Sequence, residues 1–152
     1  DEGSLMCLHG GIPIIPNNED STFEVPDLKS VKFNNRQVLI DEMDPISQQI
    51  LWNDPILNYN PKTMKPFYHS HRGIGYEIGE EIFREFSLKN QIQLLFRGHQ
   101  VFRLGYHKNF DDRFITLFSA SDYVNKIIDA RFVELDSNDI YNYRIHVIQD
   151  LP

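Results

Sequence analysis

Two apolar runs of the chain each lead to a histidine with glycine beside it. Residues 5–8 precede His9 and two glycines, and residues 94–96 lead through Arg97 and Gly98 to His99. Short apolar runs of this kind predict buried strands, and glycine leaves room next to a functional side chain. We therefore expect both imidazoles at the edge of a sheet, facing a cleft where a metal ion can bind.

Imidazole nitrogens suit borderline transition metals, and two of them can share one ion with carboxylates or amides from elsewhere. Each histidine alone is weak evidence, because a histidine at a strand end is more often structural than a ligand. The similar contexts of His9 and His99 strengthen the metal hypothesis only moderately. The other four histidines lie in polar loops or on an expected solvent face, and we leave them outside the site: His69, His71, His107 and His146.

Composition favours an ordinary globular protein. The 152 residues are enough for one domain, and the formal net charge of -7 disfavours a non-specific nucleic-acid binder, which needs clustered Lys and Arg. Divalent cations or basic peptides are better partners. Cys7 is the single cysteine and cannot form an internal disulfide, so we expect a small buried side chain and a reducing compartment.

Nothing in the sequence marks a membrane or secreted protein. No run approaches the roughly 20 apolar residues that cross a bilayer, and no signal peptide is recognisable. We expect a cytoplasmic protein, with the nucleus as a second location. The chain begins at Asp1, shortly before a strand, which suggests a fragment or one chain of a nicked protein.

Local patterns predict a mixed α/β chain. Asp44 before a proline fits the N-cap of a short helix that ends near Trp52. A second helix follows Gly79, with two glutamates in its first turn, an apolar face and a favourable pair at Glu85 and Lys89. The expected strands cover residues 5–8, 92–96, 114–119, 130–135 and 141–148, and irregular segments cover residues 9–35 and 56–71.

The last expected strand alternates apolar and polar residues. Its core face should carry Tyr141, Tyr143, Ile145 and Val147. We expect residues 1–152 to form a single α/β unit with much of its strand content near the C-terminus.

Three further side chains are candidates for the site or its support. Arg72 follows an irregular loop and precedes glycines, so it can present its planar fork to an oxyanion, although a surface arginine is the simpler interpretation. Arg97 stands at a strand end, where we favour a structural role that holds the turn through carbonyls or a carboxylate such as Asp54. Tyr123 follows a buried strand, and its hydroxyl can reach a bound phosphate or simply cover the core.

Five short segments occur in a recognisable order. Residues 7–12 contain His-Gly-Gly, residues 51–55 read Leu-Trp-Asn-Asp-Pro, and residues 72–79 begin with Arg-Gly and end with Gly. Residues 97–106 begin with Arg-Gly-His-Gln, and residues 116–120 read Thr-Leu-Phe-Ser-Ala. Together they resemble the C-terminal half of the phosphoprotein phosphatases, the metal-dependent serine/threonine phosphatases of the calcineurin-like metallophosphoesterase superfamily.

This resemblance implies half of a β-sandwich flanked by helices, with two divalent ions (manganese, iron or zinc) in the cleft above it. It implies that His9 and His99 ligate the second metal, while Arg72 and Tyr123 bind substrate and act in catalysis. In these enzymes a metal-bridging water attacks phosphorus in line and displaces the serine or threonine alkoxide. A phosphoprotein substrate and a regulatory subunit are the implied partners.

Three segments of the family, GDxHG, GDxVDRG and GNHE, have no counterpart in the chain. They supply the remaining metal ligands, a second phosphate-binding arginine and the general-acid histidine, and would precede Asp1. Two imidazoles without carboxylates hold a metal weakly, so the chain alone should be inactive. Residues 121–125 also differ from the family's Pro-Asn-Tyr-Cys-Gly run, so toxin sensitivity does not carry over.

Three functions remain open on the sequence. The leading hypothesis is a serine/threonine protein phosphatase of which this chain is the C-terminal half. A second is a metallophosphoesterase that acts on dinucleotide polyphosphates or other small phosphoesters. A third is a non-catalytic phosphatase-like interaction module, in which the absent half is degenerate.

Overall fold

The computed structural model describes residues 4–17, 19–31 and 42–148. The chain divides into two compact units, which are named here after one residue of each. The Arg72 unit consists of residues 8–92, and the Tyr123 unit joins residues 1–7 to residues 93–152. Helices and strands both occur, so the α/β class is confirmed, whereas the single domain stays a prediction. None of the helices in the described ranges is long and apolar enough to cross a membrane.

Helix α1 (Pro45–Trp52) of the Arg72 unit begins at the predicted N-cap. Asp44 Oδ1 accepts a hydrogen bond from the Ser47 N–H at 2.9 Å, and proline occupies the first turn. The helix ends at Asn53, whose backbone is extended. Its fully buried side chain is Gln49 rather than one of the predicted apolar residues.

Helix α2 (Glu80–Asn90) follows Gly79 as predicted. It buries an apolar face that includes Phe83 and Phe86. Lys89 donates from Nζ to the Val25 carbonyl at 2.7 Å, so it ties the helix to the preceding loop rather than serving only the predicted charge pair. The helix is therefore fixed to its own unit by polar as well as apolar contacts.

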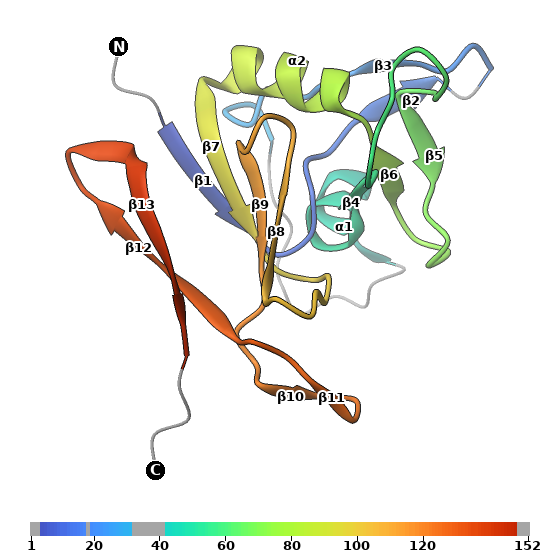
Figure 1. Ribbon diagram of the computed structural model, residues 1–152. Coiled ribbons are helices and arrows are strands. Elements are labelled where there is room, and N and C mark those ends of the chain that lie inside the picture. The colour runs from blue at the N-terminus through green and yellow to red at the C-terminus, as the bar shows by residue number, and fades with distance from the viewer. Residues whose placement is uncertain (1–3, 18, 32–41, 149–152) are drawn as a thin grey trace. The chain divides into compact units, whose positions relative to one another are not determined.

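A three-stranded sheet stands beside α1 in the order β4 (Asp54–Pro55), β6 (Tyr76–Ile78) and β5 (Phe67–His69) (Figure 1). Strand β6 runs parallel to β4 and antiparallel to β5. The expectation that residues 56–71 lack regular structure is therefore wrong at β5. Phe67 is buried there, and hydrogen bonding to β6 rather than an alternating pattern defines the strand.

The expected irregular segment at residues 9–35 also contains a hairpin, formed by β2 (Ile15–Asn17) and β3 (Thr22–Glu24). Near its turn, side-chain oxygens accept hydrogen bonds from backbone N–H groups. Asn17 Oδ1 accepts from the Glu19 N–H, and Asp20 Oδ1 accepts from the Thr22 N–H. Asn17 and Asp20 therefore support a hairpin here, and Pro16 lies within its first strand. Residues 32–35 of the predicted loop lie outside the described residues.

The Tyr123 unit contains a four-stranded sheet whose order is β1 (Ser4–Leu8), β7 (Ile92–Arg97), β9 (Phe114–Leu117) and β8 (Tyr106–Asn109). Strand β9 runs parallel to β7 and antiparallel to β8. Three of these strands were predicted within a few residues. Strand β8 was not, because its polar residues, His107 and Lys108 among them, show no apolar alternation.

A long ribbon of β12 (Arg131–Asp136) and β13 (Asp139–Val147) packs on this sheet (Figure 1). The shared core is centred on Leu94, Phe96 and Ile115, and the ribbon contributes four side chains to it. Those four are Val133, Ile140, Tyr143 and Ile145. The contact of a ribbon with a sheet gives this unit two layers of β-structure, as the resemblance implied.

Two burial predictions are wrong in this unit. Tyr141 and Val147 were expected on the core face, but they are 54% and 47% exposed. Ile140, next to Tyr141, packs on the core instead, so strict alternation does not hold at the start of β13. Cys7 was expected to be buried and is exposed. Partial burial nevertheless raises the pKa of its thiol.

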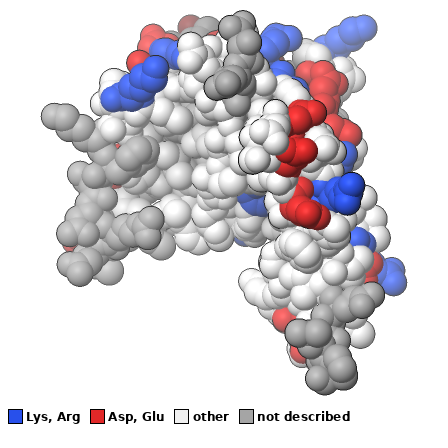
Figure 2. All heavy atoms as spheres, turned by 90° about the vertical axis from the view of Figure 1, so that its left-hand side faces the viewer, with Lys and Arg blue, Asp and Glu red and all other residues white. Residues whose placement is uncertain are grey.

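Charged side chains of both signs lie next to one another on the surface. Figure 2 shows acidic and basic groups interspersed over one face, beside a broad area that carries neither. Such interspersed charges give the drawn face no strong field of one sign.

Candidate functional site

Residues 70–75 join β5 to β6 and form a tight turn, called here the Arg72 loop. The Ser70 N–H donates to the Gly75 carbonyl at 3.0 Å, and the Gly73 N–H donates back to the Ser70 carbonyl at 3.1 Å. Gly73 and Gly75 adopt φ values of 79° and 75°, a region that glycine enters without steric cost. The Arg72 N–H donates to Ser70 Oγ at 3.1 Å. The backbone around Arg72 is therefore fixed from within the loop.

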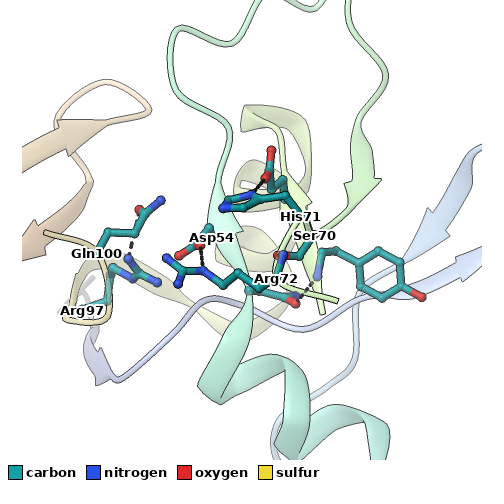
Figure 3. Close-up of polar contacts among 9 residues, drawn as sticks. Asp54, Ser70, His71, Arg72, Arg97 and Gln100 are labelled. Atoms are coloured by element: carbon teal, nitrogen blue, oxygen red, sulfur yellow. Dashed lines mark hydrogen bonds and ion pairs between the residues drawn. The ribbon is translucent and has the colours of Figure 1, made fainter. Parts of the chain in front are cut away.

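The side chain of Arg72 is held by a carboxylate that lies at the end of α1. Its Nε donates to Asp54 Oδ2 at 2.9 Å (Figure 3). The Asp54 side chain is 1% exposed, whereas that of Arg72 is 32% exposed. A buried carboxylate needs a charged or hydrogen-bonding partner. Here the partner is Arg72, whose side chain remains partly exposed. Within the described residues the terminal nitrogens of Arg72 donate to no other group, so they can receive an anion.

Asn53, directly before Asp54, connects the helix end to two other segments. It is fully buried, and its Nδ2 donates to the Ile12 carbonyl at 2.8 Å and to Gln49 Oε1 at 3.1 Å. Its Oδ1 accepts from the Tyr76 N–H at 2.7 Å. A buried amide with these hydrogen bonds fixes the relative positions of residues 12, 49 and 76. The loop that carries Arg72 therefore shares one polar framework with the segment that follows His9.

His9 lies directly after β1, as predicted, and is exposed. The glycines beside it have a different purpose from the one expected. A Cβ on Gly10 would lie 2.3 Å from the Leu51 carbonyl carbon, and one on Gly11 would lie 2.7 Å from the Asn53 carbonyl oxygen. These glycines therefore allow close packing against the end of α1 rather than simply clearing space beside the imidazole.

His99 follows the end of β7, as predicted, and has a left-handed φ of 66°. Arg97 is 3% exposed, and its Nη1 donates to Gln100 Oε1 at 3.0 Å across the turn (Figure 3). This contact supports the structural role predicted for Arg97. Asp54, the carboxylate suggested for Arg97, accepts from Arg72, and its contact with Arg97 stays a prediction.

Tyr123 lies in a short hairpin of β10 (Asp122–Tyr123) and β11 (Lys126–Ile127). The two residues between these strands, Val124 and Asn125, have φ values of 50° and 60°. Tyr123 is 47% exposed, and its ring meets that of Phe118 edge-on with centroids 5.1 Å apart. Tyr123 is therefore partly exposed at the surface of its unit.

The structure brings some predicted site residues together and leaves others as predictions. Arg72 is joined to Asp54, a residue that sequence reasoning had not assigned to Arg72. His9 and Arg72 belong to the Arg72 unit, and His99 and Tyr123 belong to the Tyr123 unit. No cluster of three or more metal-binding side chains occurs in the described ranges. Two imidazoles suit a transition metal chemically, and they need further ligands from elsewhere in the protein.

Two supporting residues, Asn53 and Asp54, were missed as parts of the phosphate-binding arrangement. The sequence contained an indication of this role. Asn-Asp-Pro ends the amphipathic helix, and a carboxylate that is buried there needs a positively charged or hydrogen-bonding partner. Sequence alone did not show that Arg72 is a partner of Asp54.

Comparison with known proteins decides the family. Residues 1–102 match calcineurin-like phosphoesterases. The chain belongs to this family. The match includes His9, Arg72 and His99, and it confirms the resemblance inferred from the five ordered segments. Calcineurin-like phosphoesterases use divalent metals.

Similar members of the family are protein phosphatases by name. The chain is 28% identical over 151 residues to the serine/threonine-protein phosphatase PP2A-like PPG1 of Saccharomyces cerevisiae, covering 95% of this chain and 38% of that protein. It is 26% identical over 142 residues to the serine/threonine-protein phosphatase 6 catalytic subunit of Caenorhabditis elegans, covering 90% and 37%. The phosphoesterase chain thus spans less than two fifths of these relatives.

A solved structure shows the same fold. It is a protein serine/threonine phosphatase from Saccharomyces cerevisiae with similarity to human phosphatase PP5. The two superpose with a TM-score of 0.68 at 22% sequence identity, over 97% of this chain and 45% of the other. The predicted fold class, part of a metallophosphoesterase domain, is therefore confirmed.

Proposed function

We propose that the protein hydrolyses phosphoserine or phosphothreonine in other proteins and that this chain supplies the phosphate-binding arginine. The observation that carries the proposal is Arg72, held through Nε on buried Asp54 with its terminal nitrogens available. The names of the relatives support a protein substrate over a small phosphoester.

Arg72 binds the substrate phosphate in this proposal. A guanidinium presents parallel N–H donors that match two phosphate oxygens, and charge-assisted hydrogen bonds of this kind are short and strong. Asp54 accepts from Nε and from neither terminal nitrogen. The carboxylate therefore orients the arginine without competing for the nitrogens that would contact phosphate.

His9 and His99 are proposed as ligands of a divalent metal, with manganese, iron and zinc as candidates. Two metal ions, when bound in the complete protein, supply an activated water and neutralise charge on the phosphate. Each imidazole contributes one nitrogen lone pair and must be neutral to do so. Two imidazoles without carboxylates hold a metal weakly, so the chain alone should be inactive.

Tyr123 is proposed to cover the bound phosphate. Its exposed ring and hydroxyl can donate one hydrogen bond to a phosphate oxygen and exclude water from one side. A phosphoprotein substrate and a regulatory subunit remain predicted partners, and a cytoplasmic location remains a prediction.

Two variants of the full-length gene product test the assignment. His99→Ala should lower bound metal and turnover of a phosphoserine peptide together, because a ligand is lost. Arg72→Ala should keep the metal content and weaken both phosphate inhibition and turnover. Unchanged metal content in His99→Ala removes that residue from the metal site, and unchanged phosphate inhibition in Arg72→Ala removes the phosphate-binding role. Faster turnover of small phosphoesters than of phosphopeptides would favour the second hypothesis.

A further inference from the structure

The residue beside Arg72 makes a contact that sequence analysis did not include in the site. Nδ1 of His71 lies 2.6 Å from Oε1 of Glu77, which belongs to β6 (Figure 3). The pair reaches across the chain from the tip of the Arg72 loop to the strand that follows it. It therefore closes a ring of residues, 71–77, that contains Arg72. This pair is called the His71–Glu77 clasp below.

The other contacts of the loop hold its base and the Arg72 side chain, whereas the clasp holds the residue before Arg72. A Cβ built on Gly73 would meet no atom within 4 Å, so the chain on that side of Arg72 faces open space. Gly73 and Gly75 have no side chains that would restrict the backbone of the loop. The Arg72 side chain is held at Nε by Asp54, and its N–H is held by Ser70. The clasp adds a side-chain contact at His71, the residue directly before Arg72.

Nδ1 of His71 must carry a hydrogen to donate to Glu77, because an ionised carboxylate only accepts. A neutral ring with its hydrogen on Nδ1 donates to the carboxylate, and a doubly protonated ring does the same with added charge. In both states Nδ1 is occupied by Glu77. The His71 side chain is 73% exposed and that of Glu77 is 29% exposed, so the pair is accessible and weakly stabilising for the fold. Its consequence is local geometry rather than overall stability.

We infer that the His71–Glu77 clasp positions Arg72 for phosphate. This inference rests on the proposed role of Arg72. A bidentate contact from a guanidinium to phosphate needs the fork at a defined angle, and the angle follows the backbone of the loop. His71 and Glu77 are thus positioning residues that act through Arg72. Breaking the clasp weakens phosphate and substrate binding and leaves the chemical step nearly unchanged.

The test measures inorganic phosphate affinity, KM and kcat in the metal-loaded full-length gene product with a phosphoserine peptide. His71→Ala should raise the phosphate dissociation constant and KM by about threefold to fivefold, with kcat within about twofold, because an exposed pair is a small effect. His71→Asn should restore both values to within about twofold of the parent, since its amide nitrogen can take the place of Nδ1.

The chain offers a matched control. His146 Nε2 and Glu134 Oε2 form a second exposed pair of the same kind, 2.8 Å apart on the β12–β13 ribbon. His146→Ala removes that pair and should leave phosphate affinity unchanged. Equal phosphate affinities in His71→Ala and His146→Ala would overturn the inference.

Arg72→Ala separates failure of this inference from failure of the proposed function. If Arg72→Ala weakens phosphate binding and His71→Ala does not, only the positioning role is lost. If Arg72→Ala leaves phosphate binding unchanged, both the phosphate-binding role and the clasp are overturned.

Discussion

The Arg72 loop and the β10–β11 hairpin each carry a side chain proposed to act on phosphate, but the two turns are held in different ways. The Arg72 loop is anchored from below by buried polar groups, chiefly Asn53 and Asp54. The hairpin exposes most of its side chains, including Val124 at 72% and Ile127 at 87%. Its two central residues adopt left-handed φ values although neither is glycine.

This difference indicates two kinds of functional surface. A fork that binds phosphate must keep its direction, and a buried hydrogen-bond framework supplies that. A hairpin that meets protein substrates can vary in sequence, because few buried groups depend on it. Substitutions in the framework should therefore cost stability and function together, whereas substitutions in the hairpin should change contacts with little loss of stability.

The strongest way to break the comparison is Asn53→Ala. It leaves the Ile12 carbonyl, the Gln49 amide and the Tyr76 N–H each short of a buried partner. We expect the free energy of unfolding to fall by about 3 to 5 kcal/mol, measured by urea denaturation. The matched control is Asn142→Ala, which removes an exposed amide with one hydrogen bond and should cost less than about 1 kcal/mol. Similar losses in both variants would contradict the idea of a buried framework.

The two glycines of the Arg72 loop give the next largest effect. Gly73 and Gly75 share a positive φ, so alanine is strained at both, by roughly 1 kcal/mol. A Cβ on Gly75 would also lie 2.6 Å from Asn53 Oδ1 and 3.3 Å from the Trp52 carbonyl carbon. Thermal denaturation should therefore show Gly75→Ala less stable than Gly73→Ala by about 2 kcal/mol. Equal melting temperatures for the two variants would show that Gly75 does not lie against Asn53.

The N-cap of α1 lies at the opposite end of the helix from Asn53, so a substitution there tests the stability of the helix apart from the buried framework. Burial raises the pKa of Asp44, but hydrogen bonds from Ser47 and from the Ile46 N–H outweigh it and hold the pKa below its usual value. The folded pKa is lower than the unfolded one, so the stabilisation is present at neutral pH and disappears as pH falls through the folded pKa.

Asp44→Ala should therefore cost about 1 kcal/mol at pH 7 and much less in strong acid. Asp44→Asn keeps a capping oxygen without the charge and should show little of this pH dependence. The measurement is the free energy of unfolding of each variant between pH 7 and pH 2. A difference that does not change with pH would rule out the carboxylate as the capping group.

The smallest expected effect is a gain, in the hairpin. Val124 is β-branched and has a φ of 50°, where a branched side chain is disfavoured and asparagine is tolerated. Because Val124 is mostly exposed, Val124→Asn should lose few contacts and raise the free energy of unfolding by roughly 0.5 to 1 kcal/mol. Ile127→Asn, at an exposed position in β11, should stay within about 0.5 kcal/mol of the parent. A destabilised Val124→Asn variant would show that the valine makes contacts in solution.

Features set by neighbouring residues could be predicted from the sequence. The N-cap at Asp44, the helix after Gly79 and the placement of His9 and His99 beyond strand ends all follow from patterns a few residues long. The family followed from five such segments in order. The active-site roles of His9, His99, Arg72 and Tyr123 came with that resemblance and stay predictions.

Features that join distant segments could not be predicted. The pairing of Arg72 with Asp54 depends on a contact between two segments that the chain brings together, the end of α1 and the Arg72 loop. Strands β5 and β8 exist because neighbouring strands supply hydrogen bonds, not because their residues alternate. The exposure of Tyr141 reflects which neighbouring side chain, here Ile140, packs on the sheet, and a local pattern does not show this.

The most direct test of the proposed function is to measure transition-metal content and phosphoserine-peptide turnover for the full-length gene product beside this 152-residue chain alone. We predict near-stoichiometric metal and turnover in the full-length protein, and neither in the chain alone, because His9 and His99 need further ligands. A full-length protein that is loaded with metal and binds phosphate, yet turns over no phosphopeptide, would contradict the phosphatase assignment and favour a phosphatase-like interaction module.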